Sequence, residues 1–104
     1  MNASVTVDEL LRLAIDKLYL SILVDTTETI RYVGRDYAQI LELPQDQIVG
    51  QPLRKIIPNS YLPHVLRTRT AEFGRPFVMK NYQLTVCNYL PLETSDGVLR
   101  GALA

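Results

Sequence analysis

The side chains that could carry out chemistry are few and widely spaced in this sequence. It contains one histidine, His64, and one cysteine, Cys87. A metal site needs several ligands at close spacing, and nucleophilic catalysis needs a nucleophile, a base and an orienting acid. The candidate carboxylates lie apart, in predicted turns and on predicted helix exteriors: Glu42, Asp46, Glu72, Glu93 and Asp96. We therefore expect no enzymatic activity, no metal site and no cofactor.

Asn88 is a polar residue inside the apolar segment "YQLTVCNYLPL". Strand alternation places it on one sheet face with Leu84, Val86 and Leu90, where an amide needs a hydrogen-bond partner. We expect a backbone partner, and a ligand is the alternative. The lone Cys87 is expected to be a small buried hydrophobic residue, in agreement with a reducing compartment.

The composition limits the partners that the chain can have. Its 104 residues are enough for one domain, and 11 Lys and Arg balance 11 Asp and Glu. A chain without net charge has no field that attracts nucleic acid or anionic lipid. No run approaches the roughly 18 apolar residues of a membrane span, and the N-terminus lacks the order of a signal peptide. We expect a cytoplasmic protein that binds neither nucleic acid nor membrane.

Residues 6 to 18 predict an amphipathic helix at the N-terminus. Thr6 and Glu9 have the spacing of a capping box, and apolar residues then recur at helical spacing. The stripe is too long for one helix to expose to water, so it covers either the chain's own sheet or another chain. We expect residues 1–19 to form a flanking segment and 20–104 a domain. The candidate dimer-interface residues are Val7, Leu10, Leu11, Ala14 and Leu18.

The middle of the chain predicts a hairpin followed by helices. "YLSILVD" and "IRYVG" have strand composition around the turn "TTET". Three short helical pieces follow between residues 34 and 57, separated by Pro44 and Gly50. A longer helix is predicted from 59 to 74, with Asn59 or Ser60 as its cap and Gly74 at its end.

Three further strands are predicted in "FVMK", "YQLTVCNYLPL" and "VLRGALA". Two strands, a set of helices and a three-stranded meander favour an α+β fold, with an antiparallel sheet and helices on one of its faces.

The segment "ILVDTTETIRYVGRDYAQILELPQDQIVGQPL" resembles the first half of a Per-Arnt-Sim (PAS) domain. The second half, with "IIPNSYLPHVLRT" and "DGVLRGALA", is similar to the PAS sensors that precede the ATPase of sigma-54-dependent transcription activators. The resemblance implies a five-stranded sheet, a regulatory role and a homodimer, with the ATPase and DNA-binding output domain elsewhere in a parent chain. Since "GALA" ends inside a predicted strand, we expect a fragment.

Two positions depart from the PAS pattern. Gly34 stands where the family usually has an Asn that caps the next helix, and Asp36 is predicted to cap it instead. Arg69 stands where the subgroup often has Gly, which alters at most a helix end.

The resemblance also implies where a ligand would bind. A cavity can form between the segment 34–57, the longer helix and the sheet, although the same apolar residues would also fill a packed core, which we favour. His64 is expected to face water rather than bind haem, and Cys87 lies in a strand, unlike the reactive cysteine of flavin photosensors. The candidate pocket residues are Tyr37, Ile40, Leu41, Ile57, Leu62, Val65, Leu66 and Asn88.

Three classes of function are left open. The chain is a sensory module that binds an unidentified small molecule, a ligand-free PAS-like interaction module of a histidine kinase or other signalling protein, or, least favoured, a small enzyme.

Overall fold

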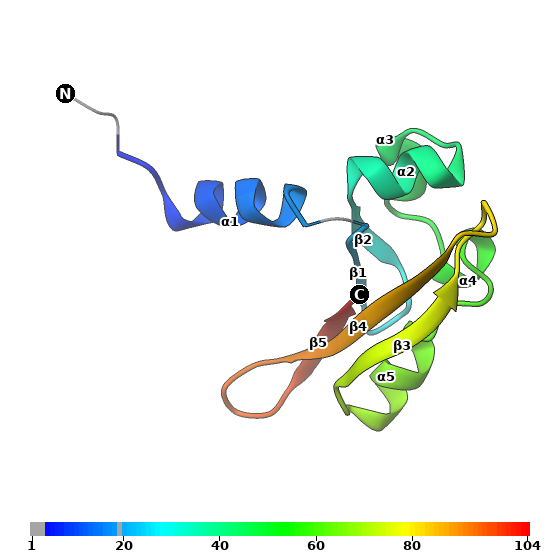
Figure 1. The fold of residues 1–104 in the computed structure, drawn as a ribbon. Coiled ribbons are helices and arrows are strands. Elements are labelled where there is room, and N and C mark those ends of the chain that lie inside the picture. The colour runs from blue at the N-terminus through cyan, green and yellow to red at the C-terminus, as the bar shows by residue number, and fades with distance from the viewer. Residues whose placement is uncertain (1–3, 19) are drawn as a thin grey trace.

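The computed structural model describes residues 4–18 and 20–104 and shows one antiparallel sheet with helices on one face (Figure 1). Residues 1–3 of the predicted flanking segment, and Tyr19 at the start of a predicted strand, lie outside the described residues. The sheet has the order β2-β1-β5-β4-β3. The predicted α+β class and five-stranded sheet are therefore confirmed. The elements are α1 (Val7–Asp16), β1 (Ile22–Asp25), β2 (Ile30–Val33), α2 (Arg35–Leu41), α3 (Gln45–Ile48), α4 (Leu53–Ile56), α5 (Leu62–Thr68), β3 (Glu72–Val78), β4 (Leu84–Glu93) and β5 (Leu99–Leu103).

The turn between β1 and β2 is organised by Asp25. Its Oδ1 accepts hydrogen bonds from the N–H of Thr27 at 2.9 Å and of Thr29 at 3.1 Å, and from the Thr27 hydroxyl at 2.7 Å. The hydrogen bond from the Thr27 hydroxyl contributes most to lowering the pKa of Asp25. Desolvation of the carboxylate opposes this and raises the pKa in part. A short acceptor that holds its own downstream N–H groups is typical of turn aspartates.

The start of α2 differs from the prediction. Gly34 is the cap and no side chain bonds there, so Asp36 does not cap the helix and lies exposed in its first turn. The reason is that the helix already begins at Arg35, so Asp36 stands inside it and past the cap position. A Cβ at position 34 would lie 3.3 Å from the Ser21 hydroxyl. The carboxylate of Asp36 still lies near the positive end of the helix.

Helix α5, predicted to be the longer one after the hairpin, has seven residues, as many as α2, and is shorter than predicted. It ends at Thr68, where Arg69 turns into the left-handed region with φ 55°, and β3 already begins at Glu72. Its cap is Tyr61, with no side-chain cap bond, rather than the predicted Asn59 or Ser60; the Ser60 hydroxyl accepts from the Leu62 N–H at 3.2 Å. Gly74, predicted to end the helix, lies within β3 with φ +69°, where the register between β3 and β4 shifts.

The core lies between the inner face of the sheet and helices α2 to α5. Ile30, Ile48, Leu53 and Leu62 have no exposed area, and α5 contacts β4 and β5. The inner face carries Phe77, Met79, Tyr89 and Ala102. Alternate residues of the same strands lie outside and are exposed: Val78, Leu84, Val86, Leu90 and Leu92.

Helix α1 lies apart from the rest of the molecule (Figure 1). Thr6 caps it by accepting from the Glu9 N–H at 3.0 Å, as predicted, and none of its residues is buried. The sequence left open whether the apolar stripe of α1 covers the chain's own sheet or another chain, and in the structure it does not cover the sheet. No helix of the described residues is long and apolar enough to cross a membrane.

Candidate functional site

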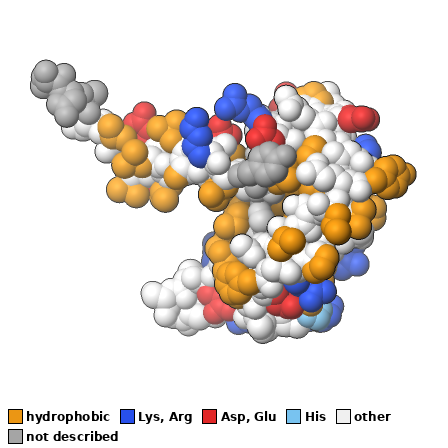
Figure 2. Space-filling model, viewed as in Figure 1, with side chains coloured by type: hydrophobic (Ala, Val, Ile, Leu, Met, Phe, Trp, Pro, Cys, Tyr) orange, Lys and Arg blue, Asp and Glu red, His pale blue; other side chains and the backbone are white. Residues whose placement is uncertain are grey.

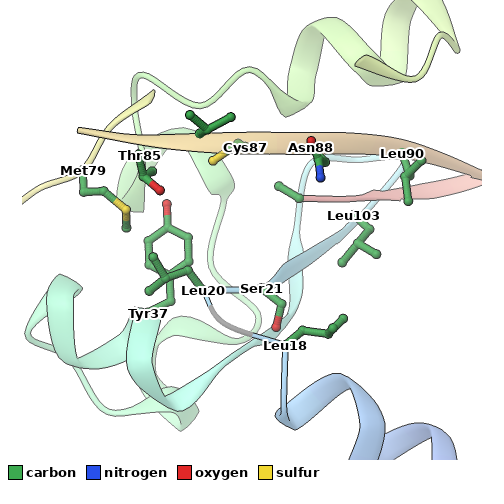
Figure 3. Close-up of a pocket in the computed structure, with 12 residues that line it drawn as sticks. Leu18, Leu20, Ser21, Tyr37, Met79, Thr85, Cys87, Asn88, Leu90 and Leu103 are labelled. Carbon is green, nitrogen blue, oxygen red and sulfur yellow. The ribbon is translucent and has the colours of Figure 1, made fainter. Parts of the chain in front are cut away.

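Tyr37 lies at the centre of the candidate site. Helix α2 places its ring against the inner face of the sheet, and the hydroxyl points toward β4 near Thr85 (Figure 3). Burial raises the pKa of Tyr37 far above its ordinary value, with a smaller effect of Cys87. The phenol therefore stays neutral and can offer a hydrogen bond but no charge. Two hollows adjoin this ring.

The first hollow, of about 260 Å³, opens beside β4 where β5 ends. Its polar groups are already partly used: the Ser21 hydroxyl donates to the Ile15 carbonyl at 3.4 Å, and Asn88 Oδ1 accepts from the Gly74 N–H at 3.0 Å. Burial raises the pKa of the Cys87 thiol, so this cysteine is not an activated nucleophile. The lining residues are Leu18, Leu20, Ser21, Tyr37, Met79, Thr85, Val86, Cys87, Asn88, Leu90, Leu103 and Ala104.

The second hollow, of about 450 Å³, lies between α2, α4 and the β3–β4 turn. Polar groups at its rim are tied to the backbone: the Lys80 ammonium donates to the Leu41 carbonyl at 3.1 Å, and the Asn59 amide donates to the Val78 carbonyl at 2.9 Å. An apolar floor with a few polar rim groups suits a small, mostly apolar molecule. Its lining residues are Tyr37, Leu41, Lys55, Ile56, Ile57, Pro58, Asn59, Phe77, Val78, Met79, Lys80 and Tyr82.

The structure distributes the predicted pocket residues over the two hollows, the core and one half-buried position outside both. Tyr37 lines both hollows, Leu41 and Ile57 line the second, and Asn88 lines the first. Ile40 is half-buried and lines neither hollow. The remaining candidates, Leu62, Val65 and Leu66, are buried in the core under the sheet and line neither hollow.

Sequence reasoning missed Phe77 and Met79, which line the second hollow. The alternation at the end of β3 and in the residue after it could have identified them, because both are buried while Val78 between them is exposed. Asn88 lies on the same sheet face as Leu84 and Val86, as predicted, and this face is the exposed outer one. Its side chain nevertheless has the expected backbone partner, the Gly74 N–H at the irregularity in β3.

His64 does not simply face water. Its ring packs on Tyr61 with centroids 4.5 Å apart, and its Nε2 lies 3.7 Å from Glu72. Arg67 lies 2.8 Å from Nδ1, which must accept because a guanidinium only donates. The Tyr61 hydroxyl contributes most to lowering the pKa of Glu72, burial opposes it, and Arg75 adds to it. This cluster joins α5 to β3. Across the described residues no group of three or more potential ligands is placed to hold a metal ion.

The candidate dimer-interface residues form a continuous exposed stripe. Val7, Leu10, Leu11 and Leu18 are each more than half exposed, and Ala14 is exposed with them. Figure 2 shows hydrophobic side chains along α1 and over the sheet on the same side of the molecule. Apolar surface of this extent is typical of an interaction site.

No family model and no curated protein matches the sequence. The structure is similar to the PAS domain of nitrogen regulation protein NR(II) from Vibrio parahaemolyticus, with a TM-score of 0.59 and 15% identity over 90% of this chain and 94% of that chain. The fold is therefore that of PAS domains.

Two further solved structures are also similar. The VqmA dimer of Vibrio cholerae, described among LuxR-type receptors, gives a TM-score of 0.63 and 12% identity over 95% of this chain. A chain of the Escherichia coli DhaR(N)–DhaL complex gives 0.67 and 11% over 90% of this chain. The present chain spans only 50% and 33% of these two proteins.

Proposed function

We propose that the chain is the sensory or regulatory PAS module of a bacterial signalling protein and that it works as a homodimer through α1. The observation that carries this proposal is the exposed apolar stripe of α1, because such a stripe on a helix with no buried residue is typical of a surface that another chain covers. The sequence pattern favours a sigma-54-dependent activator as the parent protein. The cytoplasm is the proposed location, and DNA binding and ATP hydrolysis are assigned to an output domain of that parent.

Substituting the stripe tests the dimer. Leu10→Asp with Leu11→Asp places two carboxylates in the proposed interface, and we expect the variant to sediment as a monomer at concentrations where the parent sequence is a dimer. Arg12→Asp introduces the same residue on the polar side of α1 and should leave the dimer intact.

Circular dichroism distinguishes loss of the interface from loss of the fold. A folded double variant that remains dimeric would exclude α1 as the interface, and a monomeric parent sequence would exclude the homodimer itself.

A second candidate function is the sensing of a small molecule. It is favoured by the hollow of about 450 Å³ that adjoins Tyr37 and by the short helices α2 and α4 that line it. In this version, ligand contact shifts the segment 34–57 and the sheet passes the change to α1. The other members of the fold class include VqmA, which has been seen with DPO bound.

Mass spectrometry of the protein as purified from cells tests this candidate. A native mass that exceeds the denatured mass by a small molecule supports sensing, and Tyr37→Leu should reduce that excess whereas Ile40→Leu, outside both hollows, should not. Equal native and denatured masses, together with no change in melting temperature across a metabolite library, would favour the ligand-free module.

A further inference from the structure

The second hollow, between α2, α4 and the β3–β4 turn, combines an apolar floor with a basic rim. Lys55 lines it from α4 and Lys80 from the β3–β4 turn, and both residues are exposed. Among the described residues that line it there is no aspartate or glutamate. The floor consists of buried side chains: Tyr37, Leu41, Ile57, Phe77 and Met79. The hollow therefore has positive charge at its mouth and apolar surface inside.

The two rim lysines have no carboxylate partner in the part of the chain that the structure describes. The sequence holds three lysines, and two of them line this hollow. The ion pairs among the described residues all use an arginine or His64 as the cation. Lys80 donates to the Leu41 carbonyl at 3.1 Å and Lys55 to Oε1 of Gln51 at 3.4 Å, and both acceptors are neutral. Since an ammonium group carries three N–H donors, each lysine keeps donors and an uncompensated charge for a bound anion.

Tyr82, in the β3–β4 turn, occupies a backbone position that favours glycine. Its N–H bonds to the Met79 carbonyl at 2.8 Å, the Met79 N–H bonds to the Gln83 carbonyl at 2.9 Å, and the φ of Tyr82 is 66°. In a hairpin of this type the last turn residue is left-handed, and glycine adopts that conformation at the least cost. Tyr82 lines the hollow although it is 89% exposed, so core packing gains little from a tyrosine here. Its ring is placed to cover a molecule bound in the hollow.

We propose that the second hollow binds a small organic anion. Its apolar body lies on the buried floor, its anionic group faces Lys55 and Lys80, and the Tyr82 ring covers it. Here we rely on the sensing candidate described above, whose ligand would belong to this chemical class. A neutral apolar molecule would gain from burial but leave both ammonium groups without an anionic acceptor, and an inorganic anion would gain no apolar burial. Only a molecule with both parts uses the whole site.

Three probes separate the parts of the ligand. Octanoate has an apolar body and a carboxylate, octanol has the same chain without the charge, and inorganic phosphate has charge without an apolar body. We expect octanoate to shift the NMR signals of the Ile57 and Met79 methyl groups and to bind at least about tenfold more tightly than octanol. Phosphate should leave these signals unchanged. The methyl groups of Val7 and Leu10 on α1 report binding to exposed apolar surface elsewhere.

Substitution of the lysines tests the contact with the anionic group. Lys55→Gln with Lys80→Gln removes both charges, while glutamine still offers an N–H to the Leu41 carbonyl. We expect this variant to bind octanoate about tenfold more weakly and octanol as before. Lys17→Gln is the matched control, because this third lysine is exposed at the end of α1, and it should alter neither affinity.

Substitution of Tyr82 tests the cover. Tyr82→Gly should weaken octanoate binding about threefold or more, because the ring is lost, and should raise the melting temperature, because glycine suits a left-handed position. Opposite changes in affinity and stability distinguish a binding role from a structural one. An unchanged affinity for octanoate would exclude Tyr82 as the cover.

The remaining outcomes overturn the proposal. Equal affinities for octanoate and octanol would exclude selection of an anion but leave the sensing candidate in place. Phosphate that binds as tightly as octanoate would exclude the apolar part of the ligand. If no probe shifts the Ile57 and Met79 signals, the hollow takes no ligand of this class, and the comparison of native and denatured masses still decides separately whether the protein carries another small molecule.

Discussion

Arg69 adopts a backbone conformation that suits glycine better than arginine. With φ 55°, it ends α5 in the left-handed region, where a Cβ is costly. We expect Arg69→Gly to raise the free energy of unfolding by roughly 0.5 kcal/mol, because relief of this strain exceeds the added entropy of the unfolded chain. Urea denaturation measures the difference.

Arg67→Gly is the matched control for this substitution. The same change at a helical position of α5 should lower the free energy of unfolding by about 1 kcal/mol. Opposite signs at the two arginines support the left-handed end of α5. A loss of stability at position 69 comparable with that at 67 would contradict it and would assign a larger role to the contact of the Arg69 side chain with the Gly97 carbonyl.

Single residues show where sequence reasoning succeeded and where it failed. Thr6 was correctly predicted as a cap, because the distance from a hydroxyl to the next few N–H groups depends only on local geometry. For α5 the prediction was wrong, because the cap is Tyr61 rather than Asn59 or Ser60. The predicted cap of α2 was also wrong, because the helix begins at Arg35 and Asp36 stands inside it, after a glycine that offers no side chain. A cap could be predicted only where the sequence also fixed the residue at which the helix begins.

At the scale of elements, α3 and α4 are the least self-sufficient helices. Each has four residues, and each is anchored by one fully buried side chain, Ile48 or Leu53. One-turn helices are not stable by themselves. We expect their amide protons to exchange faster than those of β1 and β5, as measured by NMR-detected hydrogen exchange.

The outcome bears on the sensing proposal. Fast exchange in α3 and α4 would agree with a segment 34–57 that shifts when a ligand binds. Protection equal to that of the sheet would make this segment rigid, and the short helices would then only complete the core.

The boundaries of elements could be predicted less well than their order. The order of helices and strands follows from periodicity and was predicted. The end of α5 was predicted six residues too late, at Gly74. Both Gly74 and Arg69 have a left-handed backbone conformation, but only a glycine indicates such a conformation in a sequence. The two hollows follow from packing around Tyr37, for which apolar patterns give no signal, since a filled core and a lined cavity use the same residues.

At the scale of the whole molecule, one strand pair joins the two halves of the sheet. Among the described residues, the β1–β2 hairpin pairs with the β3–β4–β5 meander only through β1 and β5. At this junction, a Cβ on Gly101 would collide with the carbonyl of Val24. We expect Gly101→Ala to lower the free energy of unfolding by about 2–4 kcal/mol, measured by urea denaturation.

Gly97→Ala separates this collision from the ordinary loss of a glycine. Gly97 has φ +86° and open space around it, so its substitution should cost only about 1–2 kcal/mol of strain. If Gly101→Ala is no more harmful than Gly97→Ala, the two halves can move apart without penalty and the junction is looser than the structure indicates.

The attachment of α1 has a mechanical consequence. Asp16, at the end of the helix, accepts a hydrogen bond from the Tyr32 hydroxyl at 2.9 Å and one from the Arg35 guanidinium at 3.2 Å. Residues of β2 and of the start of α2 therefore hold the helix at one end. Ten residues of helix extend about 15 Å from this point. The helix is then a lever with its fulcrum at Asp16, and a tilt of about 10° there carries the free end through about 3 Å. A displacement too small to disturb the sheet thus becomes large enough to change how two such helices meet.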